Sequence, residues 1–458
     1  MPVALHALIE RARGSLFLVP TLFVIGAVAV GEITLVVDQA LSDRSQLPLV
    51  SEATVDNARA VLSTIATATV TIAGIAFSVS LLVIQLASSQ YSPRVVHNLV
   101  RDPFSKRVMG IVLGTFTYCL VVLRSVRGPL DDGGDAIVPT ISLTIAVVLG
   151  VVAVLAIVAF INHSAHSMDI SELLHEVTRS SLLAAEHGWP DRAEPADSGG
   201  HLGPAEPPPG DGFRVAFAGN GWIQRLDADG LLALVPPGGV VLVHVAVGRY
   251  AVADTPLCTV WPPPPEGDRS TVEAAAREAA LVGRTRTMRQ DASYGVRQLV
   301  DVALRALSPG VNDPTTAQDA IFHLAAVLRE VLERPEPPQV RIDGQGRRLL
   351  QPELPTHRSV VGLAFDELRP AAAPHPTVCV YLLEAMHLLC QSLPTAPATG
   401  AVRAIEEQAR LVVEASQAAD VIDHDRQRVV SAYEQRFGAR RPQAGPSGSS
   451  TRTQRVPL

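Results

Sequence analysis

The sequence predicts a mainly α-helical protein, in which a transmembrane domain of four helices is followed by a cytoplasmic α+β part. That part combines a small β-barrel-like module with a helical domain. Hydrophobic residues make up 47% of the 458 residues, and most of the excess lies before residue 162. Four apolar runs in that region are long enough to cross a bilayer as helices. From residue 213 the hydrophobic pattern takes first the period of strands and then that of helices.

The four predicted spans cover residues 15–37, 60–88, 108–126 and 137–161, within a transmembrane domain over residues 1–165. The first run is too long for the apolar part of a cleaved signal peptide. Basic residues precede the first span and fill the connection between the second and third spans (Arg11, Arg13, Arg94, Arg101, Lys106 and Arg107). Charged residues in the other two connections are mostly acidic, so the positive-inside rule places both termini in the cytoplasm. We therefore expect a multi-pass protein of the plasma membrane, with the lipid bilayer as a partner.

The second span carries a stripe of small and polar residues within an uncharged run from Ala60 to Gln90. On a helix the stripe occupies two neighbouring lines, the first with Thr64, Thr71, Ser78 and Gln85 and the second with Thr67, Gly74 and Ser88. Lipid gives no reward for exposed hydroxyl and amide groups, so we expect the stripe to face protein or water. Close packing of helices through small residues and the lining of a water-filled path both remain open.

Two further features of the spans concern polar and small residues. Glu32 lies about 25 Å along the first helix at roughly 1.5 Å per residue, near the outer interface. A carboxylate there is interfacial or paired with another helix, or it serves ion selectivity or proton binding. Gly110 and Gly114 of the third span have the spacing that allows two helices to approach closely.

The region after the membrane domain begins with a helical extension over residues 166–188. Residues 189–212 are rich in Pro, Gly and Asp and predict a linker. A strand-like period over residues 213–261 predicts a small β-rich module, which we interpret as a structural or ligand-sensing insert. A helical domain follows over residues 271–437, in which glycines at 283 and 295 are candidate interruptions, and the tail over residues 438–458 is predicted to be disordered.

One connection inside the helical domain has a clear local logic. Gly310 suits the position past a helix end, Asp313 can cap the next helix, and Pro314 suits its first position. The simplest interpretation is a tight helical hairpin. The alternative is an anion site, because a helix N-terminus near arginines attracts negative charge. The candidate ligand-binding residues are Arg286, Arg289, Arg297, Asp301, Ser308, Asn312, Asp313 and Thr315.

Composition excludes several kinds of chemistry. The formal net charge of −7 provides no basic footprint for nucleic acid. Lys106 is the only lysine and lies in a membrane-proximal loop, so a Walker A loop and lysine-bound cofactors are not expected. The four cysteines form no Cys-x-x-Cys pair and are expected to be buried apolar residues. We expect no metal site and no cofactor.

Several motifs carry a resemblance to a known family. They include Ala73-Gly74-Ile75, Gln85-Leu-Ala-Ser-Ser-Gln90, Ser92-Pro93-Arg94, Leu113-Gly-Thr-Phe116 and Leu307-Ser-Pro-Gly-Val-Asn-Asp-Pro-Thr-Thr-Ala317. The chain resembles a bacterial domain-of-unknown-function family of predicted membrane proteins over most of residues 15–430. The resemblance implies a membrane part followed by a soluble part, in the bacterial plasma membrane. It implies no activity.

Three kinds of function follow from these observations. The first is an oligomeric channel or pore, a homo-oligomer lined by the second span and regulated by the cytoplasmic domain. The second is a membrane-anchored sensor or scaffold that binds an anionic small molecule or ion at the helical hairpin. The third is an enzyme with a site near Asp291, Arg297, Asp301, Asn312 and Asp313. No nucleophile–base pair, metal motif or phosphate loop supports catalysis, so we do not expect an enzyme. The polar stripe favours the pore over the sensor.

Overall fold

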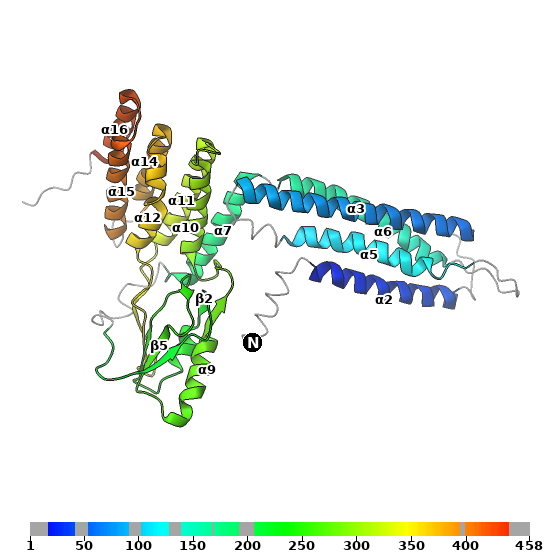
Figure 1. Cartoon of the computed structure of the whole chain (residues 1–458), viewed down its shortest axis with the longest axis horizontal. Coiled ribbons are helices and arrows are strands. Elements are labelled where there is room, and N and C mark those ends of the chain that lie inside the picture. Colours follow the sequence, from blue (N-terminus) through cyan, green and yellow to red (C-terminus); the bar gives the residue numbers. More distant parts are fainter. Residues whose placement is uncertain are drawn as a thin grey trace, which may run out of the picture. The chain divides into compact units, whose positions relative to one another are not determined.

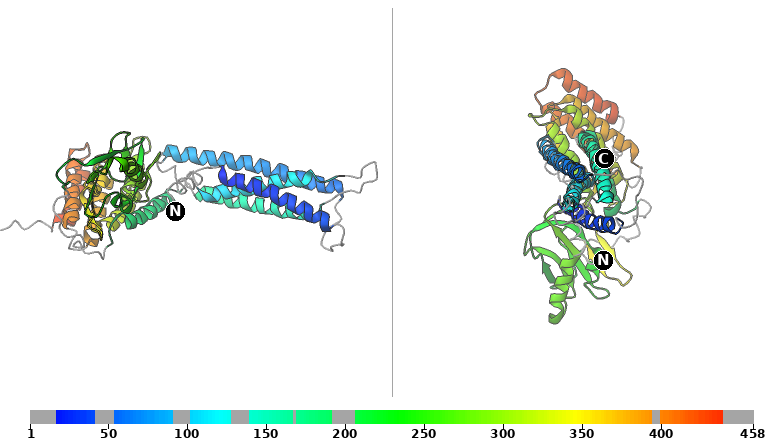
Figure 2. Two further views of the ribbon diagram at one scale, coloured as in Figure 1. Left: turned by 90° about the horizontal axis from the view of Figure 1, so that it is seen from below. Right: turned by 90° about the vertical axis from the view of Figure 1, so that its right-hand side faces the viewer.

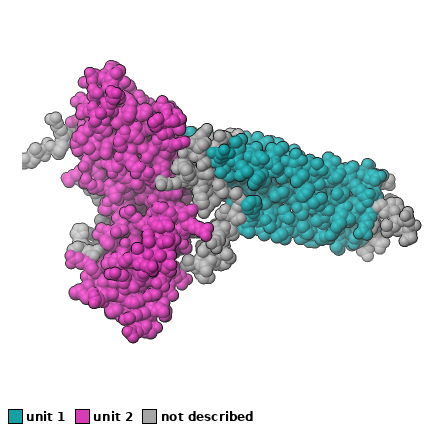
Figure 3. Space-filling model, in the orientation of Figure 1, with its two compact units in different colours: residues 1–176 teal, residues 177–458 magenta. Residues whose placement is uncertain are grey.

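The computed structural model describes residues 17–41, 54–90, 102–127, 139–166, 169–191, 206–393 and 399–438. The predicted tail, apart from Gly438, and most of the predicted linker lie outside these residues. The chain forms two compact units, residues 1–176 and residues 177–458, shown in teal and magenta in Figure 3. We call them the membrane unit and the C-terminal unit. As predicted, the chain is mainly helical, with four apolar helices followed by a part that contains both helices and sheets.

The described membrane unit contains four long helices, α2 (Leu18–Leu41), α3 (Val55–Gln90), α5 (Pro103–Leu123) and α6 (Thr140–His166), and the start of a further helix, α7 (Ile170–Gly188). Each of the four long helices is long and apolar enough to cross a membrane. They run side by side in both Figure 1 and Figure 2. Half of the apolar window of α5 is buried, against 11–17% for the other three helices. The third span therefore forms the centre of the bundle, and many of the Val, Ile and Leu side chains of the others face outward, as suits lipid.

Small residues allow α2 and α5 to lie close together. A Cβ atom on Gly110 would lie 2.6 Å from Phe23 Cδ2, and one on Gly114 would lie 3.4 Å from the Phe23 carbonyl oxygen. A Cβ on Gly31 would lie 2.8 Å from Val121 Cγ1. The Gly110-x-x-x-Gly114 motif thus serves packing between helices of one chain.

A buried carboxylate of α2 caps another helix of the bundle. Asp38 accepts hydrogen bonds from the backbone N–H groups of Ile141 and Ser142, both at 2.9 Å, and from the Ser142 hydroxyl at 2.5 Å. These donors belong to the first turn of α6, whose N–H groups lack partners within the helix. The carboxylate and the positive end of the α6 dipole stabilise each other in an apolar environment.

The C-terminal unit contains two sheets. The first has the strand order β1–β5–β3–β8–β7, and the second has the order β4–β2–β6. Only the β3–β8 pair is parallel among these ladders. The strands are β1 (Phe213–Ala216), β2 (Gly221–Leu226), β3 (Val240–Val243), β4 (Tyr250–Ala251), β5 (Pro256–Trp261), β6 (Ala280–Gly283), β7 (Val340–Ile342) and β8 (Arg348–Leu350).

Three of these strands come from sequence beyond residue 261, where we expected helices. They have three or four residues each, which is too short for a recognisable period. Gly283 ends β6 and so does interrupt the helical pattern. Gly295 instead lies inside the continuous helix α10 (Ala292–Ala306). A Cβ atom at this position would lie 1.8 Å from Ser181 Oγ of the helix that packs against it. The role of Gly295 is close packing and not interruption.

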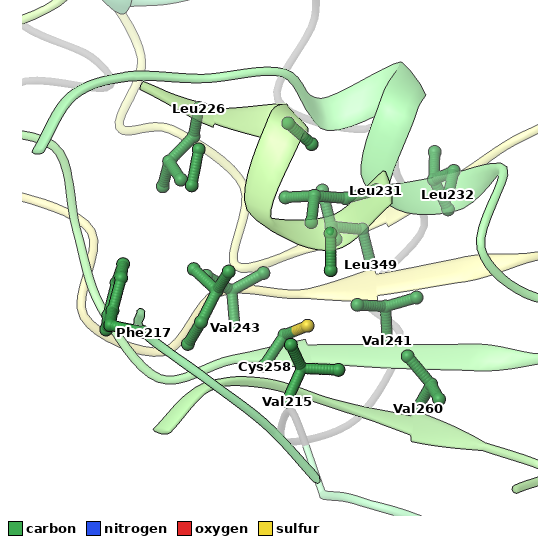
Figure 4. Packing of buried hydrophobic residues seen from close by; sticks show 14 of the residues in the cluster. Val215, Phe217, Leu226, Leu231, Leu232, Val241, Val243, Cys258, Val260 and Leu349 are labelled. Carbon is green, nitrogen blue, oxygen red and sulfur yellow. The ribbon is translucent and has the colours of Figure 1, made fainter. Parts of the chain in front are cut away.

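The two sheets and two short helices enclose one hydrophobic core. Inward side chains from β1, β3, β5 and β8 meet Leu231 and Leu232 of α8 (Ala228–Leu232), as Figure 4 shows. Burial of each large apolar side chain contributes about 1.5–3 kcal/mol. Cys258 belongs to this core, and burial raises the pKa of its thiol to about 12. All four cysteines are buried, as predicted, and Cys258 is an apolar packing residue.

Helices form the remainder of the C-terminal unit. They are the C-terminal part of α7 (Ile170–Gly188), then α9 (Arg269–Ala279), α10 (Ala292–Ala306), α11 (Pro314–Leu332), α12 (His357–Phe365), α13 (Leu368–Ala372), α14 (Pro376–Ser392), α15 (Thr399–Ala418) and α16 (Asp423–Phe437), with the short 3-10 turn η1 (Glu266–Asp268) before α9. Figure 1 shows α10, α11, α14, α15 and α16 as neighbours in one layer. The strand-bearing part and this helical layer lie against each other within the unit.

Candidate functional site

The polar stripe of α3 lies on the outside of the membrane unit. Thr64, Thr67, Thr71, Gly74, Ser78 and Gln85 are all exposed. The face packed against the other helices is built mainly from alanines, together with Leu62. Ser88 belongs to α3, but its side chain lies outside the described part. Within one chain the stripe therefore does not serve as the packing surface.

The hydroxyl groups of the stripe find acceptors in their own helix. Thr64 donates to the carbonyl oxygen of Ala60 at 2.7 Å, and Ser78 donates to that of Gly74 at 2.9 Å. Thr71 donates to the carbonyl of Thr67 at 2.8 Å. Such bonds to the preceding turn lower the cost of exposing a hydroxyl to lipid. These hydroxyl groups therefore do not require a partner from another helix or from water, and the reason for expecting the stripe to face protein or water is weakened.

Glu32 pairs with another helix. Its Oε1 lies 2.5 Å from Nη2 of Arg124, the residue that follows α5. Both side chains are at least half exposed, so the pair contributes about 0–1 kcal/mol.

The connection between α10 and α11 is a tight hairpin with its own cap. Asp313 accepts hydrogen bonds from the Thr316 N–H at 3.1 Å and the Thr316 hydroxyl at 2.6 Å, and its N–H donates to the Ala306 carbonyl. These bonds from Thr316 hold the pKa of Asp313 below its usual range. The left-handed residue of the turn is Asn312, with φ 46°, and not Gly310. Since the Asp313 carboxylate already occupies the N-terminus of α11, an anion is repelled there.

The predicted ligand-binding residues fall into separate places. Asn312 and Asp313 precede α11 and Thr315 lies in its first turn, whereas the Ser308 hydroxyl donates to the backbone carbonyl oxygen of Arg305 at the end of α10. Arg297 binds Asp301 at 2.9 Å and both carboxylate oxygens of Glu367. Arg286 and Arg289 precede α10, whose 15 residues span about 22 Å at 1.5 Å per residue. The structure thus brings these eight residues to the two ends and the middle of one helix, and they form no single site.

A large cleft lies at the N-terminal end of α10. Its cavity volume is about 820 Å³. Five distant segments line it: the end of α7 with Trp189, the residues Leu226 and Ala228, the turn from Ala246 to Arg249, the segment from Arg286 to Ser293, and the stretch from Pro337 to Leu363. Strands and helices of the C-terminal unit therefore meet at this cleft.

An ion pair organises one wall of the cleft. Arg286 Nε donates to Asp291 Oδ2 at 2.7 Å, and the Asp291 side chain is 4% exposed. Asp291 also caps α10, because its Oδ1 accepts the Tyr294 N–H at 3.1 Å. The Arg286 guanidinium lies over the ring of Tyr294, 5.0 Å from its centre. The wall is therefore held in place by hydrogen bonds, by the helix dipole and by a cation–π contact.

Three arginines and two carboxylates line the cleft. Arg286 is neutralised by Asp291, and Arg341 forms an ion pair with the exposed Asp229, with 2.9 Å between Nη2 and Oδ1. Arg249 is exposed, and its side chain has no hydrogen bond or ion pair with any residue in the described ranges. Glu353 is the other acidic residue of the lining. Arg249 is thus a cation available to a ligand.

Comparison with known proteins places the chain in a family. The family model described as "Predicted membrane protein (DUF2254)" matches residues 13–388. The chain belongs to this family. The match covers all four apolar helices of the membrane unit and every segment that lines the cleft.

Relatives at the level of whole chains are found in mycobacteria. An uncharacterized protein of Mycobacterium bovis and one of Mycobacterium tuberculosis are each 30% identical over 432 residues. The alignment covers 93% of this chain and 81% of each relative. No solved structure matches the chain. The comparisons therefore establish a membrane protein and leave its activity to the geometry of the site.

Sequence reasoning identified Arg286 but missed most of the cleft. Nothing in the sequence connects the turn at Gly248 and Arg249 with Trp189 or with Arg341, which lie about 60 to 90 residues away. The one local signal is Gly248 itself, because its φ of +82° favours glycine.

Proposed function

We propose that this family member is a membrane-anchored sensor whose C-terminal unit binds a small anionic ligand in the cleft beside Arg249 and Arg286. The observation that carries the proposal is the cleft of about 820 Å³ with an arginine that no described residue neutralises. Ligand sites typically have volumes of about 300–1,000 Å³ and few convergent polar groups. A metabolite that carries phosphate or carboxylate groups fits this size and charge.

The arginines, and not the helix dipoles, favour an anion here. Asp291 already caps α10, and the first N–H of α12 donates to Glu336 at 2.7 Å. The N-termini of α10 and α12 at the cleft thus each carry a carboxylate of the protein. An arginine without such a partner presents five donors in a planar fork, which matches a carboxylate or a phosphate.

The proposal includes the orientation that the charge pattern predicts. With basic residues before the first span and between the second and third spans, the C-terminal unit lies in the cytoplasm. The ligand is then a cytoplasmic metabolite, and the spans hold its receptor at the membrane.

A ligand screen on the full-length protein in detergent tests the proposal. Anionic metabolites should raise the melting temperature, whereas neutral analogues of the same size should not. Arg249→Gln should weaken binding by about 1.5–3 kcal/mol, the worth of a hydrogen bond to a charged group, and leave the unliganded protein as stable as before. Arg225→Gln removes another exposed arginine, from β2, and should bind as the wild type does. Equal binding by both variants would refute this assignment.

A second candidate is the oligomeric pore lined by α3. The observation in its favour is that Thr64, Thr71, Ser78 and Gln85 are exposed on the side of α3 away from its packed face. Equivalent stripes could then face a common axis in a closed homo-oligomer. Planar-bilayer recording decides this case: Ser78→Leu or Gln85→Leu should lower ion currents without loss of assembly. An absence of ion currents, together with a monomer in detergent, would exclude the pore and leave the sensor as the remaining candidate.

A further inference from the structure

A second cavity lies within the membrane unit, beside the first turn of α5. Its volume is about 160 Å³, room for about five groups the size of a water molecule. Its walls are mostly apolar, with Phe17 and Pro20 at the start of α2, Phe77, Leu81 and Ile84 of α3, and Met109 and Leu113 of α5. A crevice of this size suits part of a hydrocarbon chain and is too small for a metabolite.

The crevice is open on one side and carries a cation on the other. Phe17, Phe77 and Leu81 are 68%, 44% and 51% exposed, so they stand on the outer surface of the bundle. Lys106, the only lysine of the chain, lines the crevice and is 5% exposed, and the Asp102 carboxylate lines the same end of it. An ammonium group has three donors, so it can serve a protein acceptor and a ligand together.

The polar residues around Lys106 mark the end of the bundle. Asp102 precedes α5 and accepts the N–H groups of Phe104 and Ser105, each at 3.0 Å. The same carboxylate lies 3.0 Å from His163 Nε2, near the end of α6. These residues belong to the level where helices leave the apolar region, which is the level of lipid headgroups.

We propose that this crevice binds an anionic phospholipid of the surrounding bilayer, with one acyl chain along Phe77, Leu81 and Leu113 and the headgroup phosphate on Lys106. The argument is charge complementarity combined with shape: a buried cation at headgroup level adjoins an apolar channel that opens toward lipid. Basic pockets between membrane helices are a common site for acidic headgroups. The proposal does not depend on the cleft of the C-terminal unit.

The test measures the melting temperature of the full-length protein in neutral detergent with three additives. Phosphatidylglycerol should raise it, whereas phosphatidylcholine and inorganic phosphate should not. Lys106→Met should abolish the rise and Lys106→Arg should retain it. The matched control is Arg107→Met, which removes the adjacent exposed cation at the same depth and should respond as the wild type does.

A second variant separates lipid binding from folding. Leu81→Trp should narrow the crevice from its exposed side and abolish the rise while Lys106 stays in place. Native mass spectrometry should find phosphatidylglycerol retained by the wild type and by Arg249→Gln, and lost from Lys106→Met and Leu81→Trp. An equal loss in Arg107→Met would indicate diffuse attraction to the lipid surface and overturn the site. A rise with phosphate alone, or with phosphatidylcholine, would overturn it as well.

Discussion

Gly248 lies so close to Asp291 that a Cβ atom on the glycine would be 2.1 Å from Asp291 Oδ2. The same Cβ would lie 2.9 Å from Nη2 of Arg286. The turn that carries Arg249 therefore packs its backbone directly against the buried ion pair. Only a residue without a side chain permits both this approach and the φ of +82°.

Gly248→Ala should destabilise the C-terminal unit by more than its backbone conformation alone explains. The positive φ costs about 1–2 kcal/mol for alanine, and displacement of the ion pair adds roughly 1–3 kcal/mol. Gly238→Ala is the matched control, since Gly238 has φ 77° and no atom within 4 Å of an added Cβ. Chemical denaturation of both variants measures the difference. Equal free energies of unfolding would show that the contact with Asp291 is unimportant.

Asp313→Ala should lower the free energy of unfolding by about 0.5–2 kcal/mol through loss of the cap of α11. Hydrogen bonds from Thr316 lower the pKa of Asp313 in the folded state. Because the folded state binds the proton less tightly, this contribution is present above pH 3.8 and is lost as the pH falls through the lower folded pKa.

The wild type and Asp313→Asn should therefore differ less in stability as the pH is lowered below that value. Thr315→Ala, an exposed neighbour from the predicted anion site, should change stability by less than about 0.5 kcal/mol. If phosphate compounds raise the melting temperature of the wild type but not of the Asp313 and Thr315 variants, the hairpin is a ligand site.

His357 makes the C-terminal unit sensitive to mild acid. Burial lowers the pKa of His357, and its Nε2 lies 2.9 Å from the Arg334 carbonyl oxygen. The folded state therefore prefers the neutral ring, so stability is complete above pH 6.5 and falls as the pH drops below it. His244, whose pKa burial also lowers, acts in the same direction.

The substitution His357→Gln should reduce the loss of stability between about pH 7.5 and about pH 5. Trp189, stacked on His357 with 5.4 Å between ring centres, provides a fluorescence signal for the transition. His424→Gln changes an exposed histidine and is the control. An unchanged pH profile for His357→Gln would show that this ring does not titrate on unfolding.

Cysteine labelling decides the orientation in the membrane. Single cysteines at positions 45 and 132 lie in the two connections expected outside, and those at 103 and 449 in segments expected inside. Membrane-impermeant reagent added to intact cells should label only the first two. Labelling at 103 or 449 from outside would contradict the predicted orientation, and the ligand would then not be a cytoplasmic metabolite.

The features that depend on residues close together in the chain could be predicted from the sequence. Length and apolarity located four membrane helices, because every backbone polar group in lipid must be satisfied within its own segment. Local chemistry located the cap at Asp313 and Pro314, and a strand-like period located the β-rich region that begins at residue 213. Each of these signals lies within one continuous stretch of the chain.

Which helix faces pack and which distant residues meet could not be predicted, because both depend on the three-dimensional packing of the chain. Periodicity located the stripe through Thr64 and Ser78 on α3, but this stripe is exposed. The alanine face of α3 packs against the other helices instead, since small side chains allow closer helix contact. The cleft joins Trp189, Arg249, Arg286 and Arg341, and no local pattern links them. Their meeting depends on burial of one core by strands from residues 213–350, and such burial is a property of the whole unit.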